Sequence, residues 1–451
     1  MRLNRLDLVV SSLAAVLLLA TAIVIWRGDY VGVSILSMSP AAGNLASASA
    51  PLVIEFAQRM NAAGVEANFE IQPDTAGRFI WRDNTLFFLP QSAWARQVSY
   101  TVILRAGVED QLGHRSAEDL SWTFSVREAG LVFLRDTGSG YDLWAAQDLA
   151  DEPAQLTHAA AVFDFAVSVD GEHLVFSVIN EEDGIDLWVI DRNGENERLF
   201  LDCGPDRCSA PDWSVDDRIA FTRVTAPLTP ADPYGAPRIW LLDPKTGESL
   251  RLHSDAQKIG YGPSWSPDGQ RLAYFDGIQN RIVVLDLRNA EEIYLPSSVG
   301  VVGSWTPNGN QMIYYDTQLL AGVPANVIFR ADFETQDILP FFDPQPTDGS
   351  YSNPIVSPDG NWVAMKVRPI DSGPGDEIWV TPLDGRYALA VTDEADFLLS
   401  YAAWDPRSAG LVFSRIQLGV GNPVPEVWVW NMETAERRLF ATNADAPAWL
   451  P

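Results

Sequence analysis

Basic residues are scarce in this sequence. Only 31 Lys and Arg residues stand against 60 Asp and Glu residues, so the 451-residue chain has a formal net charge of −29. A surface of that sign repels phosphate backbones, and nucleic acid is therefore excluded as an expected partner. Solubility explains the high number of acidic residues, although acidic patches can also attract a basic protein or a divalent ion.

Cysteine and histidine are also rare. The two cysteines, Cys203 and Cys208, flank a Gly-Pro-Asp-Arg turn that can bring them within bridging reach, so we predict a local disulfide, with free thiols as the alternative. None of the four histidines stands beside them, and a zinc site normally needs four ligands. Neither a G-x-S-x-G nucleophile turn nor an H-E-x-x-H zinc helix occurs. The sequence thus predicts no catalytic residue, no metal and no cofactor.

Hydrophobic residues, in contrast, are abundant. They make up 47% of the chain, with 16 Trp among them, which is enough for substantial cores and argues against disorder. A chain of 451 residues is too long for one ordinary compact domain, although repeat folds can reach ~300 residues because each unit packs only on its neighbours. We expect two folded domains.

Residues 8–26 read LVVSSLAAVLLLATAIVIW, nineteen residues without a charge. A helix of that length, rising ~1.5 Å per residue, nearly matches a ~30 Å hydrocarbon core. Arg2 and Arg5 precede the stretch, whereas only Arg27 follows it closely, so the bias of positive charge places residues 1–7 in the cytoplasm. The sequence therefore predicts a single-pass membrane protein with most of the chain outside the cytoplasm, in the periplasm or at the cell surface.

The alternative to this anchor is a cleaved secretory signal. Residues 20–22, Ala-Thr-Ala, resemble a cleavage site after an apolar stretch. Cleavage there would leave Ile-Val-Ile-Trp, residues 23–26, at the new N-terminus, which favours an uncleaved signal anchor. Both alternatives export the protein.

Residues 33–127 show a different pattern, with short alternating strands separated by turn residues. Examples are residues 52–56, 85–89, 100–104 and 121–126. Alternation of apolar and polar residues in such short runs is typical of a β-sandwich.

The same region resembles the bacterial Ig-like domains of S-layer (SbsA-like) proteins. The resemblance depends on Ser39-Pro40, on Phe56 followed by Met60-Asn61, on Leu-Phe-Phe-Leu-Pro at residues 86–90, and on Trp-Thr-Phe at residues 122–124. In that family such a domain is usually a spacer or an adhesion module. The resemblance therefore implies a spacer.

One motif recurs every 40 to 52 residues in the last 320 residues. Its copies are Val-Ser-Val-Asp-Gly at 167–171, Trp-Ser-Val-Asp-Asp at 213–217, Trp-Ser-Pro-Asp-Gly at 265–269, Trp-Thr-Pro-Asn-Gly at 305–309, Val-Ser-Pro-Asp-Gly at 356–360 and Trp-Asp-Pro-Arg-Ser at 404–408. Each is followed by an apolar strand, then a second strand, then a weaker and more polar one. Four strands per ~45 residues predict the blade of a β-propeller.

The motif itself indicates a structural role. Pro-Asp-Gly forms a tight hairpin turn in which Gly supplies the positive φ, and Asp in such turns normally bonds its own backbone. We therefore interpret Asp170, Asp268 and Asp359 as turn residues and not as catalytic groups.

The first repeat lacks the motif, and the end of the chain supplies it. Residues 131–135, 141–144 and 154–157 give only three strands, whereas Trp-Leu-Pro at residues 449–451 is a seventh, truncated copy. Residues 448–450 are expected to pair with residues 131–135, so that the ring closes and no strand edge stays exposed. The predicted fold is all-β, with an Ig-like sandwich, a seven-bladed propeller over residues 131–451 and one N-terminal transmembrane helix.

These repeats resemble the TolB-like (WD40-like) propeller family. Its motif is the same Trp-Ser-Pro-Asp-Gly turn, followed by a strand that reads like Ile-Trp-Val-x-Asp. The resemblance implies an extracytoplasmic binding or scaffolding module, although related blades also occur beside peptidase domains. The spacer, the anchor and the extra blade depart from TolB itself, so a Tol–Pal role is not carried over.

The longest loops predict which face of the propeller binds. Residues 224–237, 318–325, 368–376 and 416–425 connect second and third strands of their blades and emerge on the side opposite the motif turns. Binding residues concentrate on such loops. The candidate partner-binding residues are Tyr234, Tyr261, Tyr351, Asp371, Asp376, Asp393, Asp396 and Tyr401. The alternative is that these loops are simply solvated.

Two functions follow from the sequence. The first is a membrane-anchored, non-enzymatic binding or scaffolding protein that presents the propeller to a protein partner. The second is an extracytoplasmic polymer-binding protein, or a hydrolytic or lyase enzyme, with its site in the propeller funnel, because propellers can assemble sites from separate loops.

Overall fold

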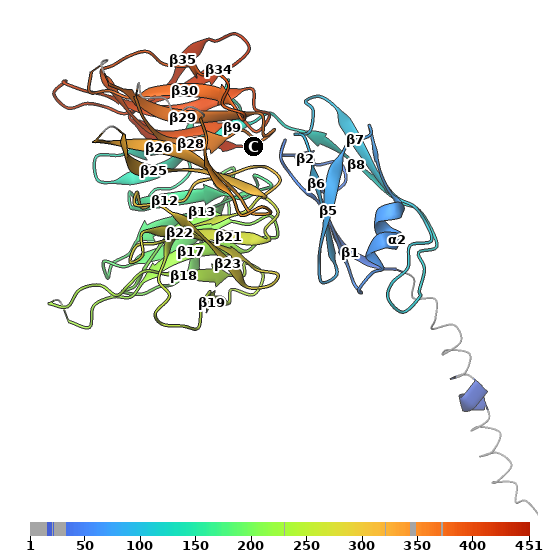
Figure 1. The fold of residues 1–451 in the computed structure, drawn as a ribbon. Coiled ribbons are helices and arrows are strands. Elements are labelled where there is room, and N and C mark those ends of the chain that lie inside the picture. The colour runs from blue at the N-terminus through green and yellow to red at the C-terminus, as the bar shows by residue number, and fades with distance from the viewer. Residues whose placement is uncertain are drawn as a thin grey trace, which may run out of the picture. The chain divides into compact units, whose positions relative to one another are not determined.

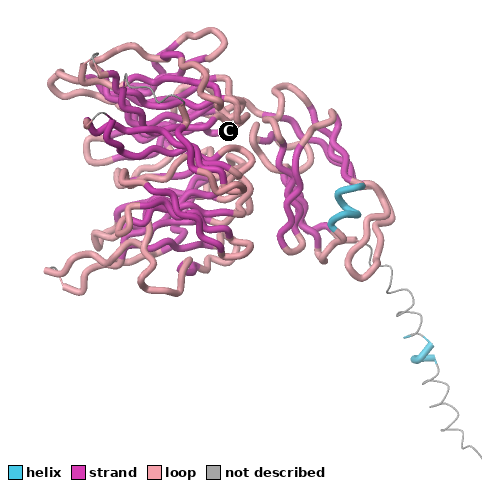
Figure 2. Tube along the Cα trace, in the orientation of Figure 1, coloured by secondary structure: helices cyan, strands magenta, loops and turns pink. Residues whose placement is uncertain are grey.

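The computed structural model describes residues 16–19, 21, 33–229, 231–320, 322–342, 349–370 and 373–451. Apart from residues 16–19 and 21, the predicted anchor at 8–26 and the segment 1–7 lie outside the described residues. Among the residues that are described, no helix has the length and apolar character to cross a membrane. The chain divides into two compact units, the first mostly within residues 33–125 and the second mostly within residues 126–451 (Figures 1 and 2).

The first unit contains two antiparallel four-stranded sheets. One has the order β1 (Ile35–Ser39), β3 (Leu52–Phe56), β6 (Thr85–Pro90), β5 (Gly77–Arg82). The other has the order β2 (Leu45–Ala46), β8 (Leu120–Val126), β7 (Ser99–Leu104), β4 (Phe69–Gln72). A short helix, α2 (Ala62–Ala67), lies between β3 and β4 in the chain, and the sequence pattern had not predicted it.

Alternation explains why these segments become strands of a sandwich. In β3, Leu52, Ile54 and Phe56 are buried while Val53 and Glu55 between them are only half-buried. One face of each strand thus supplies the core and the other faces outward. The β-sandwich predicted for this region is confirmed.

The second unit is a propeller whose blades are sets of four strands. Blade 1 consists of β36 (Ala444–Leu450), β9 (Gly130–Asp136), β10 (Tyr141–Ala146) and β11 (Ala154–Gln155). Blade 2 consists of β12 (Val162–Val167), β13 (His173–Ile179), β14 (Ile185–Asp191) and β15 (Arg198–Leu201). Blade 3 consists of β16 (Arg207–Trp213), β17 (Ile219–Val224), β18 (Arg238–Leu242) and β19 (Ser249–Arg251).

Four more blades complete the described part of the propeller (Figure 1). Blade 4 consists of β20 (Tyr261–Trp265), β21 (Arg271–Asp276), β22 (Arg281–Asp286) and β23 (Glu291–Pro296). Blade 5 consists of β24 (Ser304–Trp305), β25 (Gln311–Leu320), β26 (Val323–Asp332) and β27 (Ile338–Pro340). Blade 6 consists of β28 (Gly349–Val356), β29 (Trp362–Pro369), β30 (Glu377–Pro382) and β31 (Leu389–Ala390). Blade 7 consists of β32 (Phe397–Trp404), β33 (Gly410–Gln417), β34 (Glu426–Asn431) and β35 (Arg437–Thr442).

The ring closes through the last strand of the chain. In β36, Ala448 pairs with Val132 and Trp449 with Leu131 of β9. Apolar residues then fill the space between blades 7 and 1, where Trp449 packs in one buried cluster with side chains of β33 and β34. Similar clusters join every other neighbouring pair of described blades. The closing strand that the sequence predicted is confirmed.

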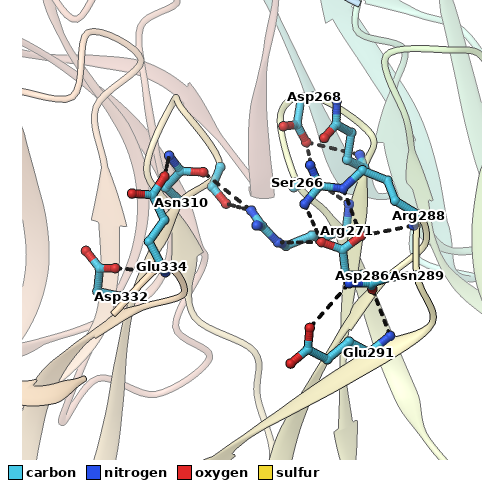
Figure 3. A network of polar contacts seen from close by, with 12 residues as sticks. Ser266, Asp268, Arg271, Asp286, Arg288, Asn289, Glu291, Asn310, Asp332 and Glu334 are labelled. Atoms are coloured by element: carbon cyan, nitrogen blue, oxygen red, sulfur yellow. Dashed lines mark hydrogen bonds and ion pairs between the residues drawn. The ribbon is translucent and has the colours of Figure 1, made fainter. Parts of the chain in front are cut away.

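The motif turn of blade 4 is a closed set of hydrogen bonds (Figure 3). In blade 4, Asp268 accepts hydrogen bonds from the Ser266 hydroxyl at 2.6 Å and from the Gln270 amide at 3.0 Å. The Ser266 oxygen in turn accepts from the Arg271 amide at 2.9 Å. Blades 2, 3 and 6 repeat the bond from serine to aspartate. The interpretation of these aspartates as turn residues is confirmed, because their oxygens are held by their own turns.

An arginine links one motif turn to the next (Figure 3). Arg271 is 9% exposed and donates from Nη1 to the Gly309 carbonyl of blade 5 at 2.8 Å. Its Nε lies 3.5 Å from Asp286 Oδ2, and its guanidinium lies over the Phe333 ring. Arg218 of blade 3 bonds the Gly269 carbonyl of blade 4 in the same way. A charge-assisted bond to the next blade therefore reinforces this side of the ring.

Candidate functional site

The innermost strands of the propeller are irregular. The pairing register shifts by a bulge within the innermost strand of blades 1, 2, 3, 4, 6 and 7. A β-bulge bends its strand and redirects a side chain, and bulges are frequent beside functional sites. The central wall of the ring therefore presents side chains that a regular sheet would not.

Some of these side chains hold the next blade. Asp212 of β16 accepts a hydrogen bond from the Trp265 amide of blade 4 at 2.6 Å, and Asp164 of β12 accepts one from the Ala210 amide of blade 3 at 2.6 Å. Burial raises the pKa of Asp212 to about 6 and also raises the pKa of Asp164. These carboxylates sit in a poorly solvated wall where the charged form is costly.

A cavity of about 540 Å³ opens on the same wall, and it is lined by residues of blades 4 to 7. We call it the inner cavity. Its apolar walls include Trp305, Ile355, Met365, Ile378 and Leu399. Ligand pockets commonly have volumes of ~300–1,000 Å³ and mostly apolar walls with a few polar groups. The inner cavity has the size and lining of such a pocket.

The polar groups of the inner cavity come from separate blades. Hydroxyl groups come from Ser264, Ser304, Tyr315, Ser400 and Tyr401, and an amide comes from Asn353. Ser304 already accepts a hydrogen bond from the Val356 amide at 3.0 Å, and Ser264 accepts one from the Trp305 ring nitrogen at 3.2 Å. Ser400 and Tyr401 lie in the bulge of β32, and Tyr401 is 56% exposed.

The inner cavity has one charged lining residue among those described, Lys366 of β29. Its Nζ lies 3.5 Å from Oδ2 of Asp376, whose side chain is 1% exposed. Arg368 donates to the other oxygen of Asp376 from Nε at 2.9 Å and from Nη2 at 2.7 Å. Two cations thus share one buried carboxylate beside the cavity.

Two predicted partner-binding residues are buried. Tyr351 is 3% exposed and packs in the core between blades 5 and 6. Asp376 is 2% exposed and is held by Arg368 and Lys366. For these two residues the prediction of an exposed binding role is corrected, because Tyr351 lies in β28 with its side chain in the core and Asp376, just before β30, is turned inward to Arg368 and Lys366.

The other predicted residues are dispersed. Tyr401 lines the inner cavity, whereas Tyr234 lies under the guanidinium of Arg207 and is 39% exposed. Tyr261 packs partly against the core between blades 4 and 5. Two acidic candidates are engaged with neighbours, Asp393 with Arg437 at 3.3 Å and Asp396 with Gln417 at 3.4 Å. Asp371 lies outside the described residues.

One predicted loop is a hairpin. Residues 318–325 continue the pairing of β25 and β26, with Gln318 opposite Ala325 and Leu320 opposite Val323. The predicted connection between second and third strands is therefore largely paired, because both strands extend to 10 residues. Leu319 is 72% exposed near its tip.

The cysteines form the predicted disulfide. Cys203 and Cys208 are bonded, with their Cα atoms 6.4 Å apart. Both are buried in the core between blades 2 and 3, where Trp213 and Phe221 also pack. The bond closes the connection between β15 and β16.

Histidines and carboxylates do not gather at the inner cavity in the described residues. No group of three His, Cys, Asp or Glu side chains there is arranged to hold a metal ion. His253 contacts the Tyr274 hydroxyl at 2.8 Å between blades 3 and 4, and burial lowers its pKa. The sequence patterns did not indicate Lys366, Ser304 and Ser400. Their positions on inner strands could have indicated all three, and the charge within an apolar strand could have indicated Lys366.

The comparisons with known proteins agree with this architecture. Residues 29–126 match the family described as the bacterial Ig-like domain. No curated protein matches the chain. The chain therefore combines a bacterial Ig-like domain with a β-propeller.

Solved structures show the propeller fold. A prolyl endopeptidase structure is 16% identical with a TM-score of 0.53, and the match covers 71% of this chain and 49% of that chain. A puromycin-hydrolyzing peptidase from Mycobacterium tuberculosis is 12% identical with a TM-score of 0.52, covering 69% of this chain and 53% of that chain. This chain thus spans about half the length of either peptidase. TolB from Acinetobacter baumannii also matches, at 13% identity and a TM-score of 0.43, over 93% of this chain and 99% of that chain.

Proposed function

We propose that this chain is a membrane-anchored, extracytoplasmic binding or scaffolding protein whose propeller holds its partner or ligand at the inner cavity. One observation carries the proposal: a cavity of about 540 Å³ with apolar walls and dispersed hydroxyl groups lies on the inner strands of blades 4 to 7. Buried cores on both sides of each of these blades make its walls rigid. A preformed pocket spends little free energy on ordering itself when a ligand binds.

The extracytoplasmic location has two supports. The uncharged stretch 8–26 is long enough to span a bilayer, and the disulfide is typical of proteins in oxidising compartments. The Ig-like domain would then serve as a spacer between membrane and propeller.

Membrane extraction tests this location. The wild type should stay in the pellet after alkaline carbonate extraction, and the double variant Leu17→Arg/Leu19→Arg should be released, since each charge in a bilayer core costs about 2.5–3.5 kcal/mol. The matched control Leu17→Val/Leu19→Val should stay in the pellet. A mature N-terminus near Ile23 would contradict the anchor.

Co-purification tests the binding role. The full chain is purified from its native membrane as wild type, as Ser400→Trp and as Ser139→Trp. Ser400 is exposed on the inner cavity, so Trp there fills the cavity without disturbing a core, whereas Ser139 lies on an exposed loop of blade 1. Molecules that bind the cavity should be lost from Ser400→Trp only. Identical partners in all three preparations would contradict the proposal.

An enzyme acting on an extracytoplasmic polymer is the second candidate. Lys366 and several hydroxyl groups share the inner cavity, and lysine can act as a base or nucleophile when its environment favours the neutral amine. The two functions differ in what is recovered after incubation with the bound molecule. A binding protein returns it unchanged, whereas an enzyme of this kind would release product and lose turnover in Lys366→Met.

A further inference from the structure

The charge of the inner cavity differs from that of the whole chain. The chain has a formal net charge of −29, yet the only formally charged residue among the 18 that line the cavity is Lys366. Lys366 is one of three lysines in the sequence, with Lys245 and Lys258. A positive group attracts an anion more strongly beside an apolar wall than in water, because the local dielectric constant is lower there.

The nearby carboxylate does not cancel this charge. Asp376 uses Oδ1 for both donors of Arg368, while Oδ2 is buried and forms no hydrogen bond with the described residues. Lys366 Nζ, at 3.5 Å from Oδ2, is an ion pair beyond the usual ~2.7–2.9 Å of a charge-assisted hydrogen bond. Asp376, Arg368 and Lys366 together carry one negative and two positive charges.

The strand register determines which face of the sheet carries the Lys366 side chain. In β29 it lies opposite Ser352 of β28 and opposite Ile378 of β30, and directly opposed residues of an antiparallel pair share one face of the sheet. Ile378 lines the cavity on that face. The side chain of Lys366 is 27% exposed and lines the cavity beside apolar residues.

We propose that the inner cavity binds an organic monoanion, an apolar body that carries a single carboxylate or similar group, with Lys366 receiving the anionic end. The inference rests on the proposed function, since it specifies what the same cavity holds. Cavity walls such as Trp305 and Leu399 bury the apolar body, and the hydroxyl groups of Ser400 and Tyr401 offer further donors. Polyanions are disfavoured, because the formal net charge of −29 repels additional negative charges.

Matched probes test the inference on the full chain. Calorimetric titration compares 4-phenylbutyrate with 4-phenylbutyramide, which have the same apolar body with and without the negative charge. The wild type should bind the carboxylate at least ~10-fold more tightly. Lys366→Met should reduce the ratio to about 1, Lys366→Arg should restore most of it, and the exposed-site control Lys245→Met should leave it unchanged.

A second readout uses the wild type alone and does not depend on the folding of a variant. Acetylation by sulfo-N-hydroxysuccinimide acetate, followed by peptide mass spectrometry, reports on all three lysines. Saturating 4-phenylbutyrate should slow acetylation of Lys366 at least ~5-fold, because the bound carboxylate would contact the Lys366 amine. Acetylation of Lys245 and Lys258 should be unaffected. A short peptide with a free C-terminal carboxylate, compared with its amide, shows whether a chain end can also supply the anion.

The failures of the two proposals are distinguishable. Equal affinity for the two probes, both abolished by Ser400→Trp, would overturn the monoanion inference and leave the cavity as the binding site. A carboxylate preference that persists in Lys366→Met, with no protection of Lys366 in the wild type, would also overturn the inference. Absence of binding by either probe, with partners still retained by Ser400→Trp, would remove both proposals.

Discussion

The motif turns and the inner cavity are two regions of one propeller, and they use polar side chains in opposite ways. At the turns, Asp268 and Ser266 satisfy each other and their own backbone, and Arg271 uses its charge on the next blade. At the cavity, Ser264 and Ser304 occupy the same repeat position and are already hydrogen-bonded, whereas Ser400 and Tyr401 occur in one blade only and Lys366 has no tight partner. Side chains that recur from blade to blade hold the ring together, and side chains that occur in one blade only are left available for a ligand.

The ring should depend most strongly on its closing strand. Trp449→Ala removes a side chain that is 8% exposed and packs between blades 1 and 7, so we expect a loss of about 3–5 kcal/mol in the free energy of unfolding. Deletion of residues 446–451 should lower the melting temperature further. Denaturant unfolding monitored by fluorescence measures both, and Leu250→Ala, at a 69% exposed outer-strand position, serves as the control. An unchanged melting temperature after the deletion would show that the ring does not need the closing strand of blade 1.

The motif turns should come next. Asp268→Ala leaves the Ser266 hydroxyl and the Gln270 amide without their acceptor, which should cost about 1–3 kcal/mol. Asp268→Asn keeps one acceptor oxygen and should recover part of the loss. Thermal melting measures the difference, and binding of 4-phenylbutyrate at a temperature where both variants are folded should stay at the wild-type level. Loss of binding with unchanged stability would reverse the roles assigned to the two regions.

The disulfide should contribute a similar or smaller amount. It closes a short loop, with a sequence separation of 5, for which loop-closure entropy predicts about 2 kcal/mol. The double variant Cys203→Ala/Cys208→Ala should therefore melt at a lower temperature than the oxidised wild type. Reductant should lower the melting temperature of the wild type and leave the variant unaffected; a wild type insensitive to full reduction would show that packing alone holds this loop.

The smallest effect should come from Asp212 and should depend on pH. Burial raises its pKa to about 6, above the ~3.9 of an unfolded chain, so the folded state binds the proton more tightly. Stability from this group is present below pH ~4 and is lost as pH rises from about 4 to 6. Asp212→Asn removes that loss and should gain about 1–2 kcal/mol relative to the wild type at pH 7 and little at pH 4. Unfolding curves at both pH values check the sign, and a gap that does not change with pH would contradict it.

The fold was readable from the sequence because it repeats. Copies such as Trp-Ser-Pro-Asp-Gly at residues 265–269 carry a local turn, a strand and an interblade contact together, and the truncated copy at Trp449 indicated how the ring closes. The cavity was not readable in this way. Lys366 and Ser400 lie 34 positions apart and share a cavity wall only because their two blades are neighbours. The buried position of the Asp376 side chain depends on its hydrogen bonds from Arg368.

The most direct test of this division of roles is the dissociation constant of 4-phenylbutyrate for Ser400→Trp and Ser139→Trp, measured beside their melting temperatures. Both variants should melt within about 2 °C of the wild type, since neither residue lies in a core. The account predicts at least a ~10-fold loss of affinity in Ser400→Trp and none in Ser139→Trp, because only the first fills the inner cavity. Equal affinities in the two variants would contradict the claim that this propeller binds its ligand at the inner cavity.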